Sequence, residues 1–488
     1  MCKMSLYIIV IAIITNILVY FNPLYATEQW GVFDYTVDWC EQVLLNSSND
    51  RLYLSCSSND MIMEIDVCSM ETLRSFPIKT PYKLCLSIDD NYLYSESISQ
   101  WPSSSICRIR LIDGCMDSVL LNGHTEGFIM NASGDHIWVC HYTYPGPDVH
   151  YGKGEVLTEH PESGLITRIS TDPFQIEQTT VTWPLPNSVW YSDYSGDVYQ
   201  LCGWGVGHPT RGFGVSIGAF DGETIELVGQ IKGGDNYAND LYISSYISNW
   251  TDDGHYGAIP NLWPENCSNK CSIKVFDTTR TEGFKNFEPS FLLTFNHPIT
   301  SEILGTEFLK KVSGTDIMWA TSDDGNPPED ENRARYVIKI NTSTHDYEVF
   351  EIPEATSPFG YFDVSADGRI LYLTQPEEGS VIKCAPGNND PICRCRIVTP
   401  MPYSGPSPAA IEFDTQGTFD EDGDDLTYHW DFDGDCVYDE PVDDSYTGDP
   451  DNPTHEYTQS REYTVNLMVT DNYQGECETS VLVSVRIM

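Results

Sequence analysis

The feature that most constrains the fold is a repeat of short β-strand patterns, with a period of roughly 40 to 50 residues. Its clearest copy runs from Val43 to Ile78 and contains four apolar strand-like runs separated by polar turns, including RLYLS and IMEID. Further copies begin near Leu84, Gly127, Thr180, Asp240, Ile303 and Gly360. Four strands per repeat at this period predict the blades of an all-β propeller over residues 28–395.

The copies indicate seven blades, and this number stays open by one. The copy from Gly360 is one strand short, and the segment from Trp30 to Val37 could supply the missing strand and close the ring. A stack of β-sandwiches is the rival interpretation, but sandwiches need about 100 residues each. The stretch DVSADGRILYLT, residues 363–374, resembles YVTN-type and WD-repeat-like propellers, a resemblance that implies the fold alone.

The C-terminal part, residues 409–488, contains runs in which apolar and polar residues alternate with a period of two. The alternating apolar residues are Leu426, Tyr428, Trp430 and Phe432, then Tyr463, Val465, Leu467 and Val469, then Val481, Val483, Val485 and Ile487. Strict alternation predicts strands with one buried face, and these runs predict a small β-sandwich. Residues 396–408 hold four prolines and are expected to be a semi-rigid linker.

This C-terminal part also resembles a PKD domain, a module with an immunoglobulin-like fold. The resemblance is carried by YHWDF (residues 428–432), PTHEY (453–457), YTV (463–465) and VTDN (469–472). PKD-like domains are extracellular modules that mediate binding or act as spacers. The resemblance therefore implies that this domain has one of those roles outside the cell or at its surface.

Charge and the N-terminus bear on localisation and partners. The 73 acidic and 26 basic residues give a net charge of −47, which argues against nucleic acid or an anionic membrane surface as a partner. One lysine precedes an apolar run from Leu6 to Phe21, and Ala26 follows shortly afterwards. This order predicts a signal peptide over residues 1–26, with an uncleaved anchor as the alternative.

The chain has 16 cysteines, of which 15 remain if Cys2 leaves with the signal peptide. Many cysteines in an exported chain predict disulfides, and an odd number leaves one thiol free or bonded to another molecule. Cys436 and Cys477 are the two cysteines within residues 409–488, so we expect them to form a bond. The other pairings cannot be deduced from the sequence.

A ligand site is predicted from four long insertions between the second and third strands of successive repeats. They span residues 141–163, 193–214, 247–270 and 322–335. In a propeller this connection lies on the same face in every blade, and functional residues concentrate on loops that a rigid scaffold holds. The candidate ligand-binding residues are Tyr142, Tyr144, His150, Tyr151, Trp204, Trp250, His255, Tyr256 and Trp263. Aromatic rings beside carboxylates suit sugars or protein surfaces.

Calcium is the metal that the C-terminal sequence suggests. The runs FDEDGDD (residues 419–425) and WDFDGD (430–435) place acids at alternate positions around a glycine, and Ca²⁺ takes six to eight oxygen ligands. The candidate ligands are Asp420, Asp422, Asp431, Asp433, Asp435 and Asp439. PKD-like domains commonly read WDFGDG here, so the additional Asp433 and the Cys436 in place of glycine are departures from that pattern. An acidic rim without an ion is the alternative.

The sequence contains no GxSxG, no HExxH and no phosphate-binding loop. We therefore expect a secreted or cell-surface protein that binds a glycan or a protein without catalysis, with the PKD-like domain as a spacer or second binding module. The alternative is a secreted propeller enzyme, either a polysaccharide lyase or a glycosidase. Acids that converge with a Tyr, His or Arg in the channel mouth would favour the enzyme.

Overall fold

The computed structural model describes residues 31–35, 37–100, 103–143, 164–182, 186–202, 216–231, 247–261, 271–279, 289–296, 298, 303–323, 335–357, 359–434, 437–438, 447–449, 452–473 and 475–488. The predicted signal peptide lies outside these ranges. Among the residues within them, no helix combines the length and the apolar character needed to cross a membrane. The chain divides into two compact units, with Met1–Gly368 and Tyr372–Lys383 in the first, and Arg369–Leu371 and Cys384–Met488 in the second.

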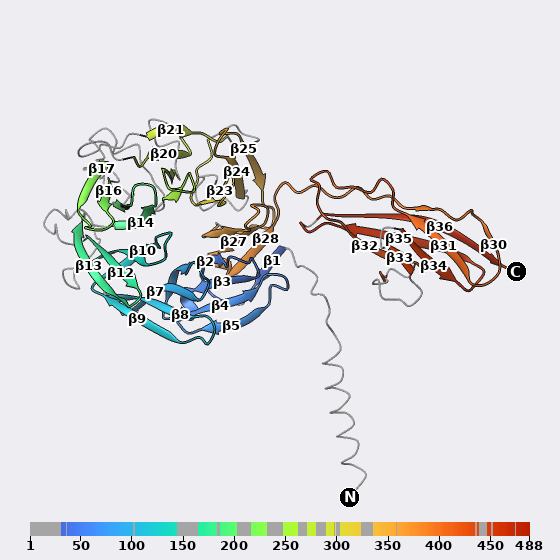
Figure 1. Cartoon of the computed structure of the whole chain (residues 1–488), viewed down its shortest axis with the longest axis horizontal. Coiled ribbons are helices and arrows are strands. Elements are labelled where there is room, and N and C mark those ends of the chain that lie inside the picture. The colour runs from blue at the N-terminus through green and yellow to red at the C-terminus, as the bar shows by residue number, and fades with distance from the viewer. Residues whose placement is uncertain are drawn as a thin grey trace, which may run out of the picture. The chain divides into compact units, whose positions relative to one another are not determined.

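The described part of the first unit forms seven four-stranded sheets, which are the blades of a β-propeller (Figure 1). Blades 1 and 2 consist of β2 (Cys40–Leu45), β3 (Arg51–Cys56), β4 (Met61–Asp66) and β5 (Thr72–Phe76), then β6 (Pro81–Leu86), β7 (Tyr92–Gln100), β8 (Ser103–Arg110) and β9 (Met116–Leu121). Blades 3 and 4 consist of β10 (His124–Met130), β11 (His136–Tyr142), β12 (Gly164–Thr171) and β13 (Phe174–Thr182), then β14 (Pro186–Ser192), β15 (Asp197–Cys202), β16 (Ser216–Asp221) and β17 (Leu227–Ile231).

Blades 5 to 7 complete the ring. Blades 5 and 6 consist of β18 (Ser248–Asn249), β19 (Tyr256–Pro260), β20 (Ile273–Asp277) and β21 (Pro289–Leu293), then β22 (Leu309–Lys311), β23 (Ile317–Asp323), β24 (Arg335–Asn341) and β25 (Tyr347–Glu351). Blade 7 consists of β26 (Phe362–Val364), β27 (Leu371–Gln375), β28 (Ser380–Cys384) and β1 (Gly31–Asp34). The first strands of neighbouring blades contact one another, for example β2 with β6 and β26, so these strands surround the central channel. Two 3₁₀ turns, η1 (Ser57–Asn59) and η3 (Pro376–Glu378), connect second to third strands.

The N-terminal strand closes the ring, as the sequence predicts. Strand β1 pairs antiparallel with β28, with Gly31 opposite Lys383 and Asp34 opposite Ser380. Blade 7 thus takes three strands from the end of the propeller sequence and its fourth from the beginning. This pairing joins the two ends of the repeat array and covers the edge of β28 that an open ring would leave unpaired.

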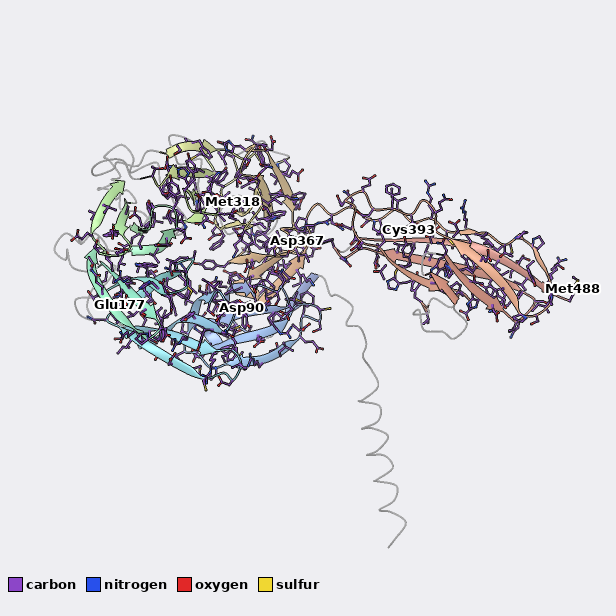
Figure 2. All side chains as sticks on the ribbon, viewed as in Figure 1. Asp90, Glu177, Met318, Asp367, Cys393 and Met488 are labelled. Carbon is purple, nitrogen blue, oxygen red and sulfur yellow. A yellow bond between two sulfur atoms is a disulfide. The ribbon has the colours of Figure 1, made fainter. Side chains whose placement is uncertain are left out.

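The propeller cores lie between neighbouring blades, because the central strands are buried on both faces. On β7, Leu93 packs into the core shared with blade 1, and the next residue, Tyr94, packs into the core shared with blade 3. Met318, labelled in Figure 2, is fully buried in the core that blades 5 and 6 share. Burial of each large apolar side chain in this way contributes about 1.5–3 kcal/mol to the stability of the fold. The period-two pattern of the repeats therefore serves two interfaces per blade.

The repeats also share a turn between their first and second strands. In blade 1 the Asn46 amide donates to Asp50 Oδ1 at 2.7 Å, and in blade 3 the Asn131 amide donates to Asp135 Oδ1 at 2.6 Å. Short Asn and Asp side chains stabilise such turns because they replace backbone hydrogen bonds locally. The same bond at equivalent positions confirms that the two segments are copies of one structural unit.

The second unit is a β-sandwich of two four-stranded sheets. One sheet contains β29 (Arg396–Ile397), β31 (Ala409–Asp414), β34 (Asn452–Tyr457) and β33 (Thr447–Asp449). The other contains β30 (Tyr403–Gly405), β36 (Glu476–Ile487), β35 (Glu462–Thr470) and β32 (Thr427–Asp431). The alternation predicted along β35 is confirmed, since its four apolar residues are buried between more exposed neighbours. Trp430 and Phe432 are each 3% exposed and form the centre of the core with Phe413.

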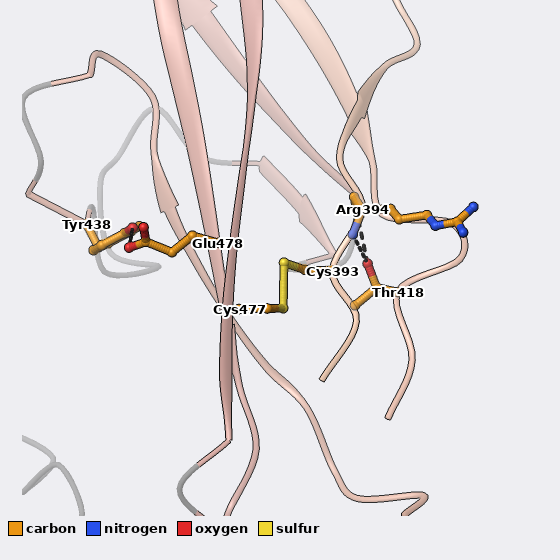
Figure 3. The surroundings of a disulfide bond; sticks show 6 residues. All are labelled: Cys393, Arg394, Thr418, Tyr438, Cys477 and Glu478. Atoms are coloured by element: carbon orange, nitrogen blue, oxygen red, sulfur yellow. Dashed lines mark hydrogen bonds between the residues drawn. A yellow bond between two sulfur atoms is a disulfide. The ribbon is translucent and has the colours of Figure 1, made fainter. Parts of the chain in front are cut away.

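The expected linker, residues 396–408, belongs to the sandwich. Strand β29 pairs antiparallel with β31, and β30 pairs parallel with β36. The preceding segment is also part of this unit, because Ile392 and Phe419 form a β-bridge and the Arg394 backbone NH donates to Thr418 Oγ1 at 2.9 Å (Figure 3). The prolines suggested a spacer, but they lie between and beside short edge strands, where a missing NH donor is tolerated.

The disulfide of the sandwich differs from the one predicted. Cys477 is bonded to Cys393, not to Cys436, which lies outside the described residues (Figure 3). The prediction was wrong because it placed the domain boundary at residue 409. The unit begins at Cys384, so Cys393 was available as a partner.

Candidate functional site

Chain topology assigns each loop of the propeller to one of two faces. In an antiparallel four-stranded blade, the turns from the first to the second strand and from the third to the fourth strand lie at one end. The connection from the second to the third strand lies at the other end, together with the connections between neighbouring blades. We call the latter end the insertion face. The long connections between β11 and β12, β15 and β16, β19 and β20, and β23 and β24 all belong to it.

The predicted ligand-binding residues do not all lie on one face of the propeller. Tyr144, His150, Tyr151, Trp204 and Trp263 lie outside the described residues. Tyr142 ends β11 on the insertion face and is 8% exposed. Trp250, His255 and Tyr256 lie in or beside the turn between β18 and β19, on the opposite face, so their assignment to the insertion face was wrong. The sequence did not reveal β18 because this strand has two residues, and without it the following turn looks like part of the insertion.

On the opposite face these aromatic residues pack against protein. Trp250 is 3% exposed and lies in the core between blades 5 and 6. His255 stacks on Tyr194 with ring centroids 4.1 Å apart, and its Nε2 lies 2.9 Å from Thr279 Oγ1. These contacts join the turns of blades 4 and 5 and give the residues a structural role.

A pocket of about 460 Å³ opens on the insertion face between blades 1 and 2. It is lined by Trp39, Ser57, Ser58, Asp60, Lys79, Thr80 and Tyr82. These residues come from the start of blade 1, the turn η1 between its second and third strands, and the connection to blade 2. Because three connections converge there, the pocket is built by chain segments that are distant in sequence.

Trp39 forms the most unusual wall of this pocket. Its φ angle is +59°, and its side chain is 43% exposed, although bulky residues rarely adopt the left-handed region. Hydrogen bonds hold the backbone there: Ser57 NH donates to the Trp39 carbonyl at 3.2 Å, and the indole Nε1 donates to Glu41. A strained backbone that presents an aromatic ring to solvent is typical of a functional position.

The other walls supply an ion pair and a second ring. Asp60 pairs with Lys79 and accepts a hydrogen bond from the Thr80 backbone NH at 2.9 Å. The Lys79 hydrogen bond lowers the pKa of Asp60. Tyr82 is 38% exposed, and burial of its hydroxyl beside Glu41 raises its pKa. The pocket therefore combines two partly exposed rings with charged and hydroxyl groups that donate and accept hydrogen bonds.

Two acids lie between blades 2 and 3, outside the lining of the pocket: Glu96 on β7 is 2% exposed, and Glu126 on β10 is partly exposed. Burial raises the pKa of both Glu96 and Glu126 to about 7, and the nearby Lys83 ammonium opposes that rise. Glu126 also accepts a hydrogen bond from Tyr142. Tyr82, one residue before Lys83, is close enough for both acids to raise its pKa. The acids therefore act on the pocket electrostatically, through Tyr82.

Several buried polar atoms of the propeller have no hydrogen-bond partner within the described ranges. They are Glu96 Oε1, Thr125 Oγ1, Thr182 Oγ1, Gln200 Oε1 and Ser322 Oγ. Thr125, Thr182 and Ser322 lie at the insertion-face ends of their strands, whereas Glu96 and Gln200 lie nearer the middle of β7 and β15. Such atoms normally bind water, an ion or a ligand. Sequence reasoning missed Trp39, Tyr82 and the acids, although Trp39 and Tyr82 lie at strand starts beside blade connections, which was a usable signal.

The predicted calcium ligands do not come together as expected. Asp435 and Asp439 lie outside the described residues. Asp431 is fully buried, and its two oxygens accept hydrogen bonds from Gly434 NH at 2.7 Å and the Asn466 amide at 2.8 Å. Asp422 accepts from the Asn389 backbone at 2.8 Å. These two carboxylates are therefore held by protein donors.

A different trio of acids is gathered in the sandwich unit. One carboxylate oxygen each from Asp420, Asp424 and Asp471 lies within 4.8 Å of the others. Asp420 Oδ2 is buried without a partner in the described part of the chain, whereas Asp424 forms an ion pair with Arg369. The trio fits a cation only in part, because the Arg369 guanidinium already supplies positive charge.

Calcium binding at Asp420 remains a prediction. If Ca²⁺ binds only the folded chain, the free energy of unfolding should rise by about 3 kcal/mol at a Ca²⁺ concentration near 100 times Kd. Chemical denaturation of the full chain with and without CaCl₂ measures this, and Asp420→Asn is expected to remove the effect. No change in the wild-type midpoint at millimolar Ca²⁺ would contradict the prediction.

Comparison with known proteins identifies the family of the C-terminal domain. Residues 402–485 match the family model of the PKD domain, which begins within the segment expected to be a linker. Similar solved structures include the hydrazine synthase of Kuenenia stuttgartiensis, 13% identical, with a TM-score of 0.49 over 72% of this chain and 97% of that one. Another is the β-propeller domain of Cps50 (Swd1) from Myceliophteria thermophila, 11% identical, with a TM-score of 0.48 over 73% of this chain and 99% of that one. The seven four-stranded sheets and the family match identify a β-propeller followed by a PKD domain.

Proposed function

We propose that the chain is an extracellular glycan-binding protein, and that its propeller binds the glycan in the Trp39 pocket. The observation that carries this proposal is the pairing of two partly exposed rings, Trp39 and Tyr82, with Asp60, Lys79 and the serines of η1. Sugar rings present apolar faces that stack on aromatic side chains, and hydroxyls that need donors and acceptors. This pocket offers both.

The charge of the chain narrows the ligand class. With a net charge of −47, the protein disfavours anionic glycans, nucleic acid and anionic membrane surfaces. Within the pocket lining, the positive charge of Lys79 is already paired with Asp60. Neutral or basic glycans are therefore the proposed ligands, with the PKD domain as a spacer or second binding module.

An enzyme is the second candidate, and one observation favours it. Glu96 and Glu126, with pKa values near 7, lie beside Lys83 and Tyr142 on the insertion face. Carboxyls whose pKa values lie near the working pH are suited to general acid and base catalysis. This is the convergence that would favour a polysaccharide lyase or a glycosidase.

A glycan-array screen of the full chain, with each captured glycan also checked for cleavage products, tests both candidates. Binding without turnover is the expected result and supports recognition in the pocket. Turnover that is lost in Glu126→Gln, while binding remains, would replace the proposal with the enzyme. Absence of both binding and turnover across neutral, basic and anionic glycans would overturn the glycan proposal and leave a protein partner as the surviving idea.

The buried Glu96 carboxyl predicts an unusual dependence of stability on pH. Glu96 is 2% exposed, and its pKa rises from 4.5 when unfolded to about 7 when folded. The folded state therefore holds more protons between these values, so stability falls as pH rises through that window. A shift of this size corresponds to on the order of 3 kcal/mol.

Glu96→Gln removes the ionisation and should stabilise the protein at pH 8 by about 2 kcal/mol more than at pH 5. Chemical denaturation of both proteins at the two pH values measures this difference. Glu71→Gln, at an exposed turn of blade 1, controls for the loss of one negative charge. Equal effects of Glu96→Gln at both pH values would contradict the assignment.

A further inference from the structure

Two cysteines face each other directly beneath the Trp39 pocket. Cys40 on β2 and Cys56 on β3 are register partners in the antiparallel sheet of blade 1, and their Sγ atoms lie 3.6 Å apart. Both side chains are fully buried. Within the described strands, this is the one register pair in which both residues are cysteines.

The strand geometry at this position suits a covalent bond. The next pair outward is hydrogen-bonded, since Ser57 NH donates to the Trp39 carbonyl, so Cys40 and Cys56 form a non-hydrogen-bonded pair. In such pairs the Cα atoms are about 4.5 Å apart and the side chains approach most closely. Disulfides accept Cα separations of about 4.4–6.8 Å, and the sulfurs need to approach by roughly 1.5 Å to reach bonding distance.

We infer that Cys40 and Cys56 form a cross-strand disulfide when the chain is oxidised. The thiolate of one cysteine attacks a disulfide-containing oxidant, such as glutathione disulfide, and one oxidant thiol leaves. The second cysteine then displaces the other oxidant thiol and forms the Cys40–Cys56 bond. Two protein thiols lose two protons and two electrons, and one oxidant disulfide is reduced to two thiols.

The burial of the pair indicates when this reaction takes place. The hydrogen bond to Cys56 and burial both raise the pKa of Cys40, so little reactive thiolate exists once blade 1 has packed. An oxidant also cannot reach two fully buried sulfurs. The bond therefore forms while the chain is folding, and afterwards it is shielded from reductants.

The bond would hold both sides of the pocket. Cys40 follows Trp39 directly, and Cys56 precedes Ser57 directly, so a covalent link between them fixes the two pocket residues that flank it. It would also help to keep Trp39 in its left-handed conformation. This consequence for ligand binding rests on the proposed function, whereas the bond itself does not.

Peptide mapping of the full chain tests the inference. The protein is folded with glutathione disulfide, its free thiols are alkylated under denaturing conditions, and it is digested with trypsin without reduction. Arg51 lies between the two cysteines, so a Cys40–Cys56 bond links two tryptic peptides that separate on reduction. The second peptide also contains Cys68, so fragmentation by tandem mass spectrometry assigns the bonded cysteine. The Cys393–Cys477 peptide in the same digest reports an independent disulfide.

The linked Cys40–Cys56 peptide is the expected result. Cys56→Ser should make Cys40 available to alkylation, while the control Cys115→Ser, at an exposed turn of blade 2, should keep the link. Alkylation of both Cys40 and Cys56 in the wild-type chain, or a bond from either to another cysteine, overturns the inference. Since the mapping needs no ligand, failure of the glycan proposal would leave this result unaffected.

Discussion

Replacing Trp39 with alanine is expected to weaken glycan binding by about 2 kcal/mol, roughly a thirty-fold loss of affinity. The substitution removes the exposed ring on which a sugar would stack. Because the side chain is 43% exposed, little core packing is lost, so the thermal midpoint should change much less than the affinity. Titration calorimetry with a glycan captured on the array measures the affinity, and a thermal scan measures the midpoint.

Two variants make this result specific. Trp39→Phe keeps a ring at the same position and should retain part of the affinity. Tyr194→Ala removes a ring that is 49% exposed on the opposite face, and it should leave binding unchanged. If Tyr194→Ala weakens binding as strongly as Trp39→Ala, the ligand does not bind in the Trp39 pocket.

The second prediction concerns closure of the propeller ring. Gly379 lies in the turn before β28 with a φ of +64°, and a Cβ atom there would overlap the carbonyl oxygen of Val37, just beyond β1. Gly379→Ala therefore adds left-handed strain of about 1–2 kcal/mol and also pushes the N-terminal segment away from blade 7. We expect a loss of at least about 2 kcal/mol in the free energy of unfolding.

Gly314→Ala separates these two causes. Gly314 has a φ of +74°, and no atom of the described residues lies within 4 Å of the place that a Cβ would take, so the variant has the strain without the overlap. Denaturant unfolding of both variants gives the difference, and limited proteolysis near residue 35 shows whether β1 detaches. Equal destabilisation by the two substitutions would show that the contact with Val37 does not support ring closure.

Local patterns in the sequence predicted most of the fold. The strand repeats predicted the blades, and the incomplete last repeat predicted that an N-terminal strand joins blade 7. Alternation from Tyr463 to Val469 predicted the buried face of β35. These features depend on periods of two residues within a strand and on repeat length along the chain, and both can be read without knowing which segments meet in space.

The site could be predicted only in part. The insertion face was correctly derived from the connections, but the two-residue strand β18 was not recognised, so Trp250 and His255 were placed on the wrong face. Trp39 was overlooked because nothing in its neighbourhood shows that its backbone is left-handed. A φ angle of this kind results from contacts with residues of another strand, which a local pattern does not contain.

The sequence by itself therefore determined the strands, their grouping into blades, and the sandwich that follows them, because hydrophobic periodicity and repeat length are local properties. Only the tertiary structure decided that Cys393 is the partner of Cys477 and that Trp39, Asp60 and Tyr82 line one pocket. It also buried Glu96 between blades, where desolvation raises the pKa of its carboxyl. The physical reason is that pairing, pocket shape and desolvation all depend on which distant segments pack together.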